Sequence, residues 1–237
     1  MTTEHVIIVG GSSGMGLALA ETLLSEGSEV TIASRSPERL EKAARSLASD
    51  RVRTVQADIA HENDVASLFN EPADHVVTTA VDGVGAYQPI VEFDADTARG
   101  VLDSKLIGAI LLAKHAAPAL RPGGSITLTS GIAAYRPSPR GSMVAAVNGA
   151  LASFARAAAL ELAPVRVNVI SPGWVDTPVW DLISGSGKAA TLAAKAEALP
   201  VGRVGRPEDI AHAIVALMRN GFITGTVLHA DGGHRLV

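Results

Sequence analysis

The sequence of 237 residues contains no cysteine and only 3% aromatic residues, and several further features are missing. Without cysteine the chain forms no disulfide, has no thiolate nucleophile and no cysteine-ligated zinc, which suits a reducing cytosol. The net charge of −4 gives no basic excess that would favour nucleic acid or an anionic membrane. No uncharged apolar run reaches the ~18 residues of a membrane span, and no signal-peptide pattern is present. We therefore expect a cytoplasmic protein with no metal site, membrane contact or nucleic-acid partner.

Short apolar, β-branched runs alternate with longer helical patterns along the chain, as in a parallel sheet with helical crossovers. The alternation predicts an α/β fold with a single domain spanning 1–237, a doubly wound, Rossmann-like sheet in three α/β/α layers. The runs lack polar alternation, which predicts strands buried on both faces. The predicted strands are His5–Val9, Glu29–Ala33, Val52–Gln56, His75–Thr79, Ser125–Thr129, Val165–Ile170 and Thr226–Ala230. The segment 178–205, rich in glycine with a weak helical stretch, is predicted to be a mobile lid over a site.

A glycine-rich loop joins the first predicted strand to a helix. Glycines let the backbone turn sharply and approach a pyrophosphate, and the helix N-terminus offers free N–H groups and a partial positive charge. The spacing Gly-x3-Gly-x-Gly also fits a simple tight turn, but its place after the first strand favours a dinucleotide site. The predicted phosphate-binding residues are Gly10, Ser12, Ser13, Gly14, Met15 and Gly16.

The second predicted strand ends without an acidic residue. An acid there would bind a ribose 2′-hydroxyl and repel a 2′-phosphate, whereas Ser34 and Arg35 can bind the phosphate. This favours NADP(H) over NAD(H), although Arg35 could also be a solvated arginine before a helix. Asp58, after the third strand, is a candidate for the adenine amino group or, equally, for a helix cap.

These residues resemble the short-chain dehydrogenase/reductase family over essentially the whole chain. The glycine loop, Asp58-Ile59, Pro172-Gly173 with Thr177, and Asp231-Gly232-Gly233 match its motifs. The resemblance implies a small-molecule substrate and a homotetramer or homodimer. It also implies further cofactor-binding positions at Ile59, Ala80, Val81, Lys105, Asn148, Pro172, Gly173, Val175 and Thr177.

The resemblance fails at the positions where the family carries its catalytic residues. The family's serine falls on Gly131, with Ser130 one residue early, and its Tyr-x-x-x-Lys falls on Val144 and Asn148. The family's structural asparagine falls on Lys105, so lysine and asparagine look exchanged between positions 105 and 148. Either Lys105 takes over the role of the family's lysine, or the two positions drifted independently.

A valine cannot supply a proton, so ordinary ketone reduction by the family's mechanism is not expected. One interpretation is an NADP(H)-dependent oxidoreductase acting on an activated carbonyl, enone, quinone or imine, with Lys105, Ser130 or Tyr135 as the acid. The other is a non-catalytic NADP(H)-binding regulatory or scaffold protein. Trp174 and Trp180, which flank the lid, could close an apolar pocket or anchor the lid.

Overall fold

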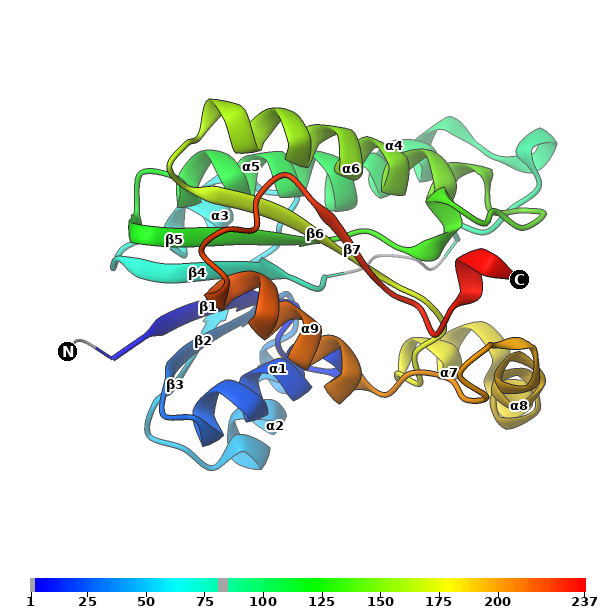
Figure 1. Cartoon of the computed structure of the whole chain (residues 1–237), viewed down its shortest axis with the longest axis horizontal. Helices are drawn as coiled ribbons and strands as arrows, with labels where there is room; N and C mark the ends of the chain where they lie inside the picture. The colour runs from blue at the N-terminus through cyan, green and yellow to red at the C-terminus, as the bar shows by residue number, and fades with distance from the viewer. Residues whose placement is uncertain (1–2, 81–84) are drawn as a thin grey trace.

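The computed structural model describes residues 3–80 and 85–237, in which seven parallel strands form one sheet between two layers of helices (Figure 1). The strand order is β3-β2-β1-β4-β5-β6-β7, which confirms the predicted doubly wound α/β fold. The strands are β1 (His5–Val9), β2 (Glu29–Ser34), β3 (Val52–Gln56), β4 (Ala73–Thr78), β5 (Leu120–Thr129), β6 (Arg166–Pro172) and β7 (Val227–Ala230).

The prediction that every strand is buried on both faces is wrong for the edges of the sheet. Strand β3 exposes Arg53, Thr54 and Gln56, and β7 is half-buried throughout. Only the central strands have helices over both faces and neighbours on both sides, which is why β1 is buried at all of its positions.

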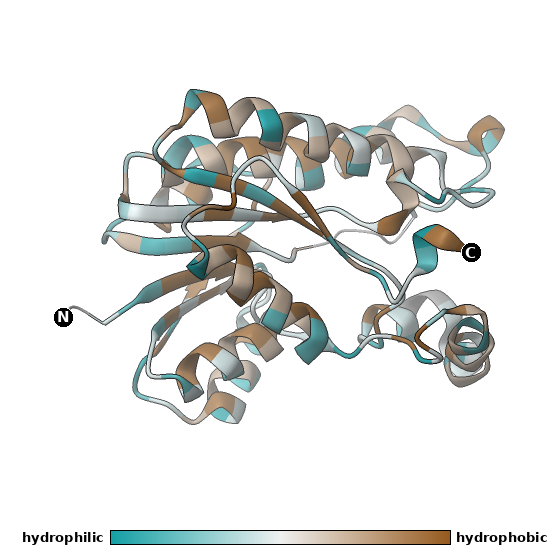
Figure 2. Ribbon diagram, viewed as in Figure 1, coloured by the Kyte–Doolittle hydropathy of each residue, from teal (hydrophilic) through white to brown (hydrophobic). Residues whose placement is uncertain are grey.

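Two apolar cores lie on the two faces of the sheet. One contains α1 (Gly14–Ser25), α2 (Pro37–Leu47) and α9 (Pro207–Arg219); the other contains α3 (Glu62–Ser67), α5 (Gly108–Ala116) and α6 (Ser142–Glu161). Figure 2 shows the apolar residues gathered in the strands and on helix faces turned toward the sheet. The remaining helices are α4 (Ala95–Leu102), α7 (Val179–Ser184) and α8 (Lys188–Ala198).

Local signals in the sequence fix several helix ends. Ser36 caps α2 by accepting a hydrogen bond from the backbone N–H of Arg39 at 3.2 Å, and Pro37 occupies the first turn. Gly27 follows α1 with φ +98°, a conformation that favours glycine. Helix α6 begins at Ser142, directly after Gly141 as its N-cap residue.

Helix α6 is, by length and composition, apolar enough to cross a membrane. Its buried side chains, among them Val147, Leu151 and Ala155, pack within the cores between the helices and the sheet. A core helix covered on one face by a sheet passes the same test of length and hydropathy, and α6 has that position here.

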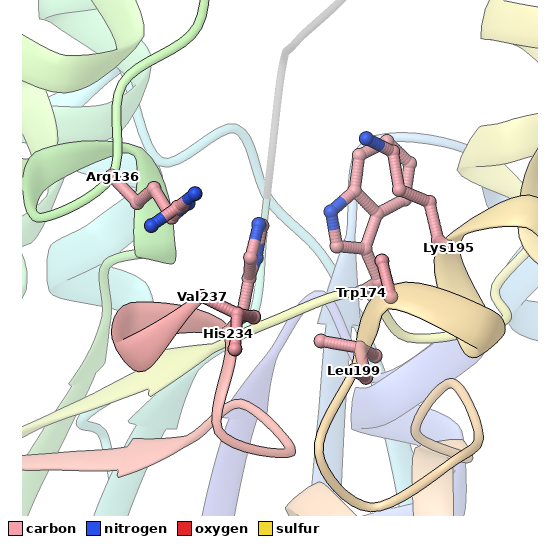
Figure 3. Close-up of a pocket in the computed structure, with 7 residues that line it drawn as sticks. Arg136, Trp174, Lys195, Leu199, His234 and Val237 are labelled. Carbon is pink, nitrogen blue, oxygen red and sulfur yellow. The ribbon is translucent and has the colours of Figure 1, made fainter.

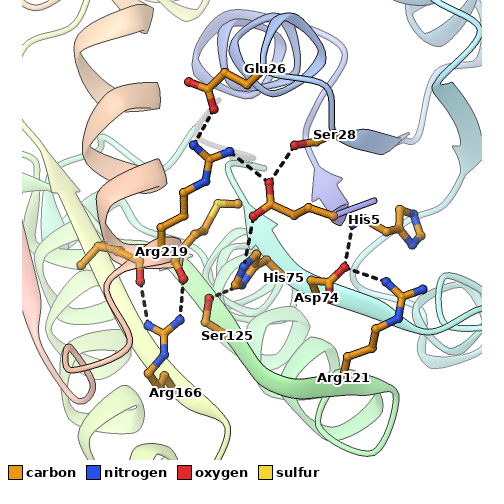
Figure 4. Close-up of polar contacts among 12 residues, drawn as sticks. His5, Glu26, Ser28, Asp74, His75, Arg121, Ser125, Arg166 and Arg219 are labelled. Carbon is orange, nitrogen blue, oxygen red and sulfur yellow. Dashed lines mark hydrogen bonds and ion pairs between the residues drawn. The ribbon is translucent and has the colours of Figure 1, made fainter. Parts of the chain in front are cut away.

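The edge of the sheet opposite the carboxyl ends of the strands carries a network of polar side chains (Figure 4). The carboxylate of Glu4 accepts hydrogen bonds from Ser28 Oγ at 2.7 Å and from Arg219 at 3.1 Å, and it lies 3.5 Å from His75 Nε2. The other ring nitrogen of His75 lies 2.8 Å from Ser125 Oγ. These contacts connect the start of β1 with α9, β4 and β5.

Helices α7 and α8 stand apart from the three layers, at the end of the molecule where β6 and β7 also end (Figure 1). Helix α8 matches the weak helical stretch predicted within segment 178–205. The segment is joined to the body by a bridge between Val175 and Gly205, with Gly205 N–H donating to Trp174 O at 2.7 Å.

Candidate functional site

The strand order reverses between β1 and β4, and the loops that follow β1, β4, β5 and β6 meet at the carboxyl edge of the sheet. Ligands of doubly wound sheets bind in the crevice outside this edge. Gly10, Ala80, Ser130 and Gly173 each follow one of these strands, so the fold brings the predicted residues to one place. Val81, also predicted to contact the cofactor, lies outside the described residues.

The glycines of the loop after β1 are required by close packing. A side-chain carbon at Gly10 (φ +91°) would lie 2.5 Å from the backbone nitrogen of Ala80, and one at Gly16 would lie 2.4 Å from the carbonyl oxygen of Gly10. Thr79 Oγ1 donates to that same carbonyl at 3.3 Å. The loop therefore holds α1 directly against the ends of β1 and β4.

The N-terminus of α1 is chemically suited to a pyrophosphate. Ser13 is the N-cap residue but makes no side-chain cap hydrogen bond, and the first turn contains no acidic residue. Free N–H groups and the helix dipole at such an end attract anions. Gly14 has φ +54°, and a side-chain carbon there would lie 3.5 Å from Thr177, so the loop after β6 comes over the phosphate loop. Ser12 and Met15 are half-buried beside it. These residues fit a dinucleotide.

The end of β2 provides the candidate site for the adenosine ribose. Ser34 is half-buried and Arg35 is exposed, and no carboxylate side chain occupies either position. Gln56 donates to the backbone oxygen of Arg35 at 3.2 Å, which fixes the backbone there. The hydroxyl of Ser36 serves the helix instead, since it caps α2 and donates to Glu38 at 2.7 Å.

Asp58 and Ile59 follow β3 as predicted. The carboxylate of Asp58 accepts from the backbone N–H of Ala60 at 3.0 Å, so it stabilises the turn before α3. Ile59 is buried under Gly108, where a side-chain carbon would come within 2.8 Å of Ile59 Cγ1. The helix-cap alternative for Asp58 is wrong, because the N-cap position of α3 is His61. The other carboxylate oxygen of Asp58 makes no hydrogen bond among the described residues, so the adenine alternative stays a prediction.

The loop after β6 approaches the site closely. A side-chain carbon at Gly173 would lie 2.7 Å from Asp231 Cα, and the Gly173 N–H donates to Ala230 O at 3.1 Å. Pro172 and Val175 are buried on either side of it. The loop is thereby held between β7 and the phosphate loop.

Ser130, Gly131 and Asn148 form a buried group at the end of β5. Ser130 Oγ donates to the backbone oxygen of Asn148 at 3.4 Å, and both residues are almost wholly buried. Asn148 Oδ1 is buried, and it has no hydrogen-bond partner among the described residues. An unpartnered buried amide oxygen costs free energy, which a bound ligand can recover.

Lys105 lies in the π-helical turn η2 (Asp103–Ile107) between α4 and α5. The turn packs against α6, and π-helical turns often occur at functional sites. Lys105 is half-buried and makes no hydrogen bond or ion pair with any described residue, so no bond joins it to Asn148. Burial lowers the pKa of Lys105 to about 8. An ammonium with this pKa can release its proton near neutral pH.

Val144 lies in the first turn of α6, among apolar side chains. It is 9% exposed and belongs to a cluster with Ala86, Val101 and Val147. The cluster offers neither a donor nor an acceptor at this point.

Tyr135 and His229 are in contact although they are far apart in the sequence. Their ring centroids lie 4.4 Å apart with an interplanar angle of 86°, and Tyr135 is 44% exposed at the mouth of the site. Sequence analysis singled out Tyr135 but not His229. The signal that could have identified His229 was its place near the carboxyl end of the last predicted strand, β7, where the site residues gather.

The two tryptophans anchor the segment 178–205. Their rings stack with centroids 4.4 Å apart, and Trp180 Nε1 donates to the backbone oxygen of Val175 at 2.8 Å. The structure therefore shows the anchoring role that we considered for the tryptophans. The alternative was that they close an apolar pocket, and Trp174 does line a pocket.

The chain is similar to known proteins over its whole length. Residues 9–235 match the family model described as enoyl-(acyl carrier protein) reductase. The short-chain dehydrogenase/reductase ATR9 of Stachybotrys chlorohalonatus is 34% identical, covering 97% of this chain and 96% of the relative. The MalC reductase/Diels-Alderase of Malbranchea aurantiaca is 32% identical, with a TM-score of 0.93 covering 99% of this chain and 97% of that one. A small-chain dehydrogenase solved with NADPH is 35% identical, with a TM-score of 0.84 and full coverage of both chains. The chain therefore belongs to the short-chain dehydrogenase/reductase family and is an NAD(P)-dependent oxidoreductase of that type.

Proposed function

We propose that the protein transfers hydride between NADP(H) and an activated acceptor: an iminium carbon, an activated enone, a quinone or an activated carbonyl. The proposal depends on one contrast. The glycine cradle for the dinucleotide is complete, whereas Val144, where the family resemblance places the catalytic tyrosine, lies in an apolar cluster. Loss of a general acid lowers a rate roughly 10²–10⁴-fold, so the favoured acceptors are those that need little help from an acid.

The preference for NADP(H) is supported by the end of β2. Ser34 and Arg35 offer a hydroxyl and a guanidinium where an acidic residue would select NAD(H). A structurally similar dehydrogenase was solved with NADPH. When bound, NADPH supplies a hydride, which an iminium carbon accepts without a proton because its π electrons neutralise the nitrogen.

For acceptors that do need a proton, Lys105 is the best placed of the three candidate acids. Ser130 directs its hydroxyl proton to the backbone of Asn148, and Tyr135 is largely exposed. The ammonium of Lys105 is half-buried without a counter-ion among the described residues, and burial lowers its pKa to about 8. It therefore holds a proton at neutral pH and gives it up more readily than an ordinary lysine.

Segment 178–205 acts in this proposal as the cover of the substrate site. The Val175–Gly205 bridge and the stacked tryptophans fix its two ends, while α7 and α8 stand away from the sheet. Between its ends the segment contacts the body through side chains, with Lys188 Nζ 2.9 Å from Asp176 Oδ1 and Lys195 over the Trp174 ring. Such side-chain contacts can break while the body stays folded, so the cover can move.

The test is NADPH oxidation by the purified protein with four acceptors: 2-methyl-1-pyrroline, menadione, 2,3-butanedione and cyclohexanone. We expect kcat/KM for at least one of the first three to exceed that for cyclohexanone by about 10²-fold, the contribution of a general acid. The variant Val144→Tyr should not gain cyclohexanone reduction, because position 148 still has no lysine. Reduction of cyclohexanone as fast as the imine, or binding of NADPH without turnover of any acceptor, would contradict the proposal.

A further inference from the structure

A pocket of about 180 Å³ lies between segment 178–205 and the C-terminal residues (Figure 3). It adjoins the candidate site at two points, since Trp174 directly follows Gly173 and Arg136 directly follows Tyr135. The lining residues are Arg136, Trp174, Lys195, Ala198, Leu199, His234 and Val237.

The charged side chains that line this pocket are all basic. Arg136 reaches in from one side, and Lys195 stands with Trp174 on the other, with His234 between them (Figure 3). Among the described residues, Arg136 and Lys195 have no carboxylate within ion-pair distance. Other surface cations of this protein commonly form an ion pair with a carboxylate, as Arg203 does with Asp209. Val237 also lines the pocket, and its terminal carboxylate forms no ion pair with either cation. Two cations around one small space create a positive potential that favours an anion.

The aromatic wall of the pocket gives it a second property. Lys195 Nζ lies 4.8 Å from the centroid of the Trp174 ring, and the His234 ring lies 6.4 Å from that ring. The other face of Trp174 is used by Trp180, which fixes the orientation of the indole. With Trp180 on one face of the indole and the Lys195 ammonium over the other, Trp174 holds this positive charge at the pocket.

One ring nitrogen of the half-buried His234 is an independent sign that the pocket is built for a polar group. Its Nδ1 is buried and has no hydrogen-bond partner among the described residues. Burial, followed by the charges of Arg136 and Lys195, lowers the pKa of His234, so the ring is neutral at neutral pH. A neutral imidazole can donate one hydrogen bond to a bound oxygen.

From this geometry we propose that the pocket binds an anionic group of the substrate, a carboxylate or a phosphate. The inference rests on the proposed function in one respect: it assigns the anion to the hydride acceptor. Arg136 and Lys195 would bind the anion from opposite sides, and the reacting carbon would extend past Tyr135 toward the end of β5.

Both tryptophans of the chain belong to this cluster, so intrinsic fluorescence reports on the pocket alone. The full-length protein without NADPH is titrated with benzoate, phenyl phosphate and the neutral control benzamide. We expect at least one anion to bind about tenfold more tightly than benzamide, the effect of about 1.4 kcal/mol from charge. The two anions distinguish a carboxylate from a phosphate.

Two variants and one matched control test the assignment. Arg136→Gln and Lys195→Gln should each reduce the preference for the anion at least threefold, with unchanged thermal midpoints. Lys42→Gln, which removes an exposed charge on α2, should leave the preference unchanged. Equal binding of benzamide and both anions, or retention of the preference in the Arg136→Gln/Lys195→Gln variant, would overturn the inference. Because these titrations need no turnover, their failure is distinct from a failure of hydride transfer.

Discussion

The amide nitrogen of Asn148 lies 3.0 Å from the point that a side-chain carbon of residue 131 would occupy. Gly131 has an extended backbone (φ 175°), which any residue can adopt, so it is the approach of Asn148 that favours glycine. Residues 131 and 148, two of the positions at which the sequence comparison expected catalytic residues of the family, therefore lie against each other.

This contact predicts the effect of adding one carbon. Gly131→Ala should lower the free energy of unfolding by about 1 kcal/mol, because the buried amide of Asn148 must move. In an Asn148→Ala background the same change should cost nothing. Gly149→Ala is the matched control: open space surrounds Gly149 on α6, so this change should raise stability by about 0.5–1 kcal/mol. Urea unfolding of the unmodified protein and the four variants measures these free energies. An equal cost of Gly131→Ala in the unmodified protein and in the Asn148→Ala background would rule out an interaction between the two positions.

Cofactor choice is predicted to depend on Arg35. Arg35→Asp should weaken NADPH binding at least tenfold, because a carboxylate repels the 2′-phosphate, and should change NADH binding far less. Arg45→Gln, on the exposed side of α2, is the control and should change neither affinity. Fluorescence titration with both nucleotides measures the constants. Equal or tighter binding of NADH by the unmodified protein would refute the preference.

The residues around the sheet show which parts of this structure can be predicted from sequence. Strand β1 has the uninterrupted apolar run Val6–Val9 and the glycine loop after it has a fixed spacing, so both were found. Strand β3 was misjudged as buried although Arg53, Thr54 and Gln56 already indicated an exposed edge. A run with only two apolar residues, Val52 and Val55 here, indicates a strand without showing where in the sheet it lies.

Other features have no local signal. The π-helical turn around Lys105 differs from an α-helix by a shifted hydrogen bond, which composition does not encode. The pocket residues Arg136, Lys195 and His234 lie in three segments that only the fold brings together. Their meeting depends on how segment 178–205 is anchored through the stacked tryptophans.

Acid sensitivity is predicted at Glu4. Its hydrogen bond with His75, together with those from Arg219 and Ser28, lowers the pKa of this carboxyl from 4.5 to about 2. A carboxyl group whose pKa is lower in the folded chain than in the unfolded chain stabilises the fold fully at pH values above its unfolded pKa. For Glu4 this stabilisation is lost as the pH falls from 4.5 toward 2. Glu4→Gln should therefore cost about 1–2 kcal/mol at pH 7, and the difference from the unmodified protein should shrink below pH 4. The exposed Glu41→Gln should cost less than about 0.5 kcal/mol at any pH. A pH-independent cost of Glu4→Gln would contradict the assignment.

The pKa of Lys105 predicts the opposite pH dependence. Burial lowers it from 10.5 to about 8, so the folded state binds fewer protons here than the unfolded state between these values. The penalty for a buried ammonium is fully present below pH 8 and is lost as the pH rises toward 10.5. Lys105→Met should accordingly be the more stable protein at pH 7, with its advantage decreasing between pH 8 and pH 10. Urea midpoints compared at each pH cancel the titration of other groups. A constant difference would show that the lysine is solvated.

The exchange of lysine and asparagine between positions 105 and 148 gives the last prediction. The two residues lie on elements that pack together, η2 and α6; Lys105 has no counter-ion and Asn148 Oδ1 has no hydrogen-bond partner among the described residues. An ammonium on its four-carbon stem can move toward a bound ribose, where Asn148 can accept from it. Lys105→Asn and Asn148→Lys should each weaken NADPH binding or turnover about tenfold, within the range for charge-assisted hydrogen bonds.

If the two act together, the double variant should recover at least threefold of the loss, because charge and amide change places. If the two residues drifted independently, the effect of the double variant in a double-mutant cycle should equal the sum of the two single effects. Asn148→Met removes the amide without adding a charge, and thermal midpoints verify that each variant is folded. Recovery in the double variant with no recovery in Lys105→Asn/Asn148→Met would show that the ammonium, and not the packing of α6, is the shared requirement.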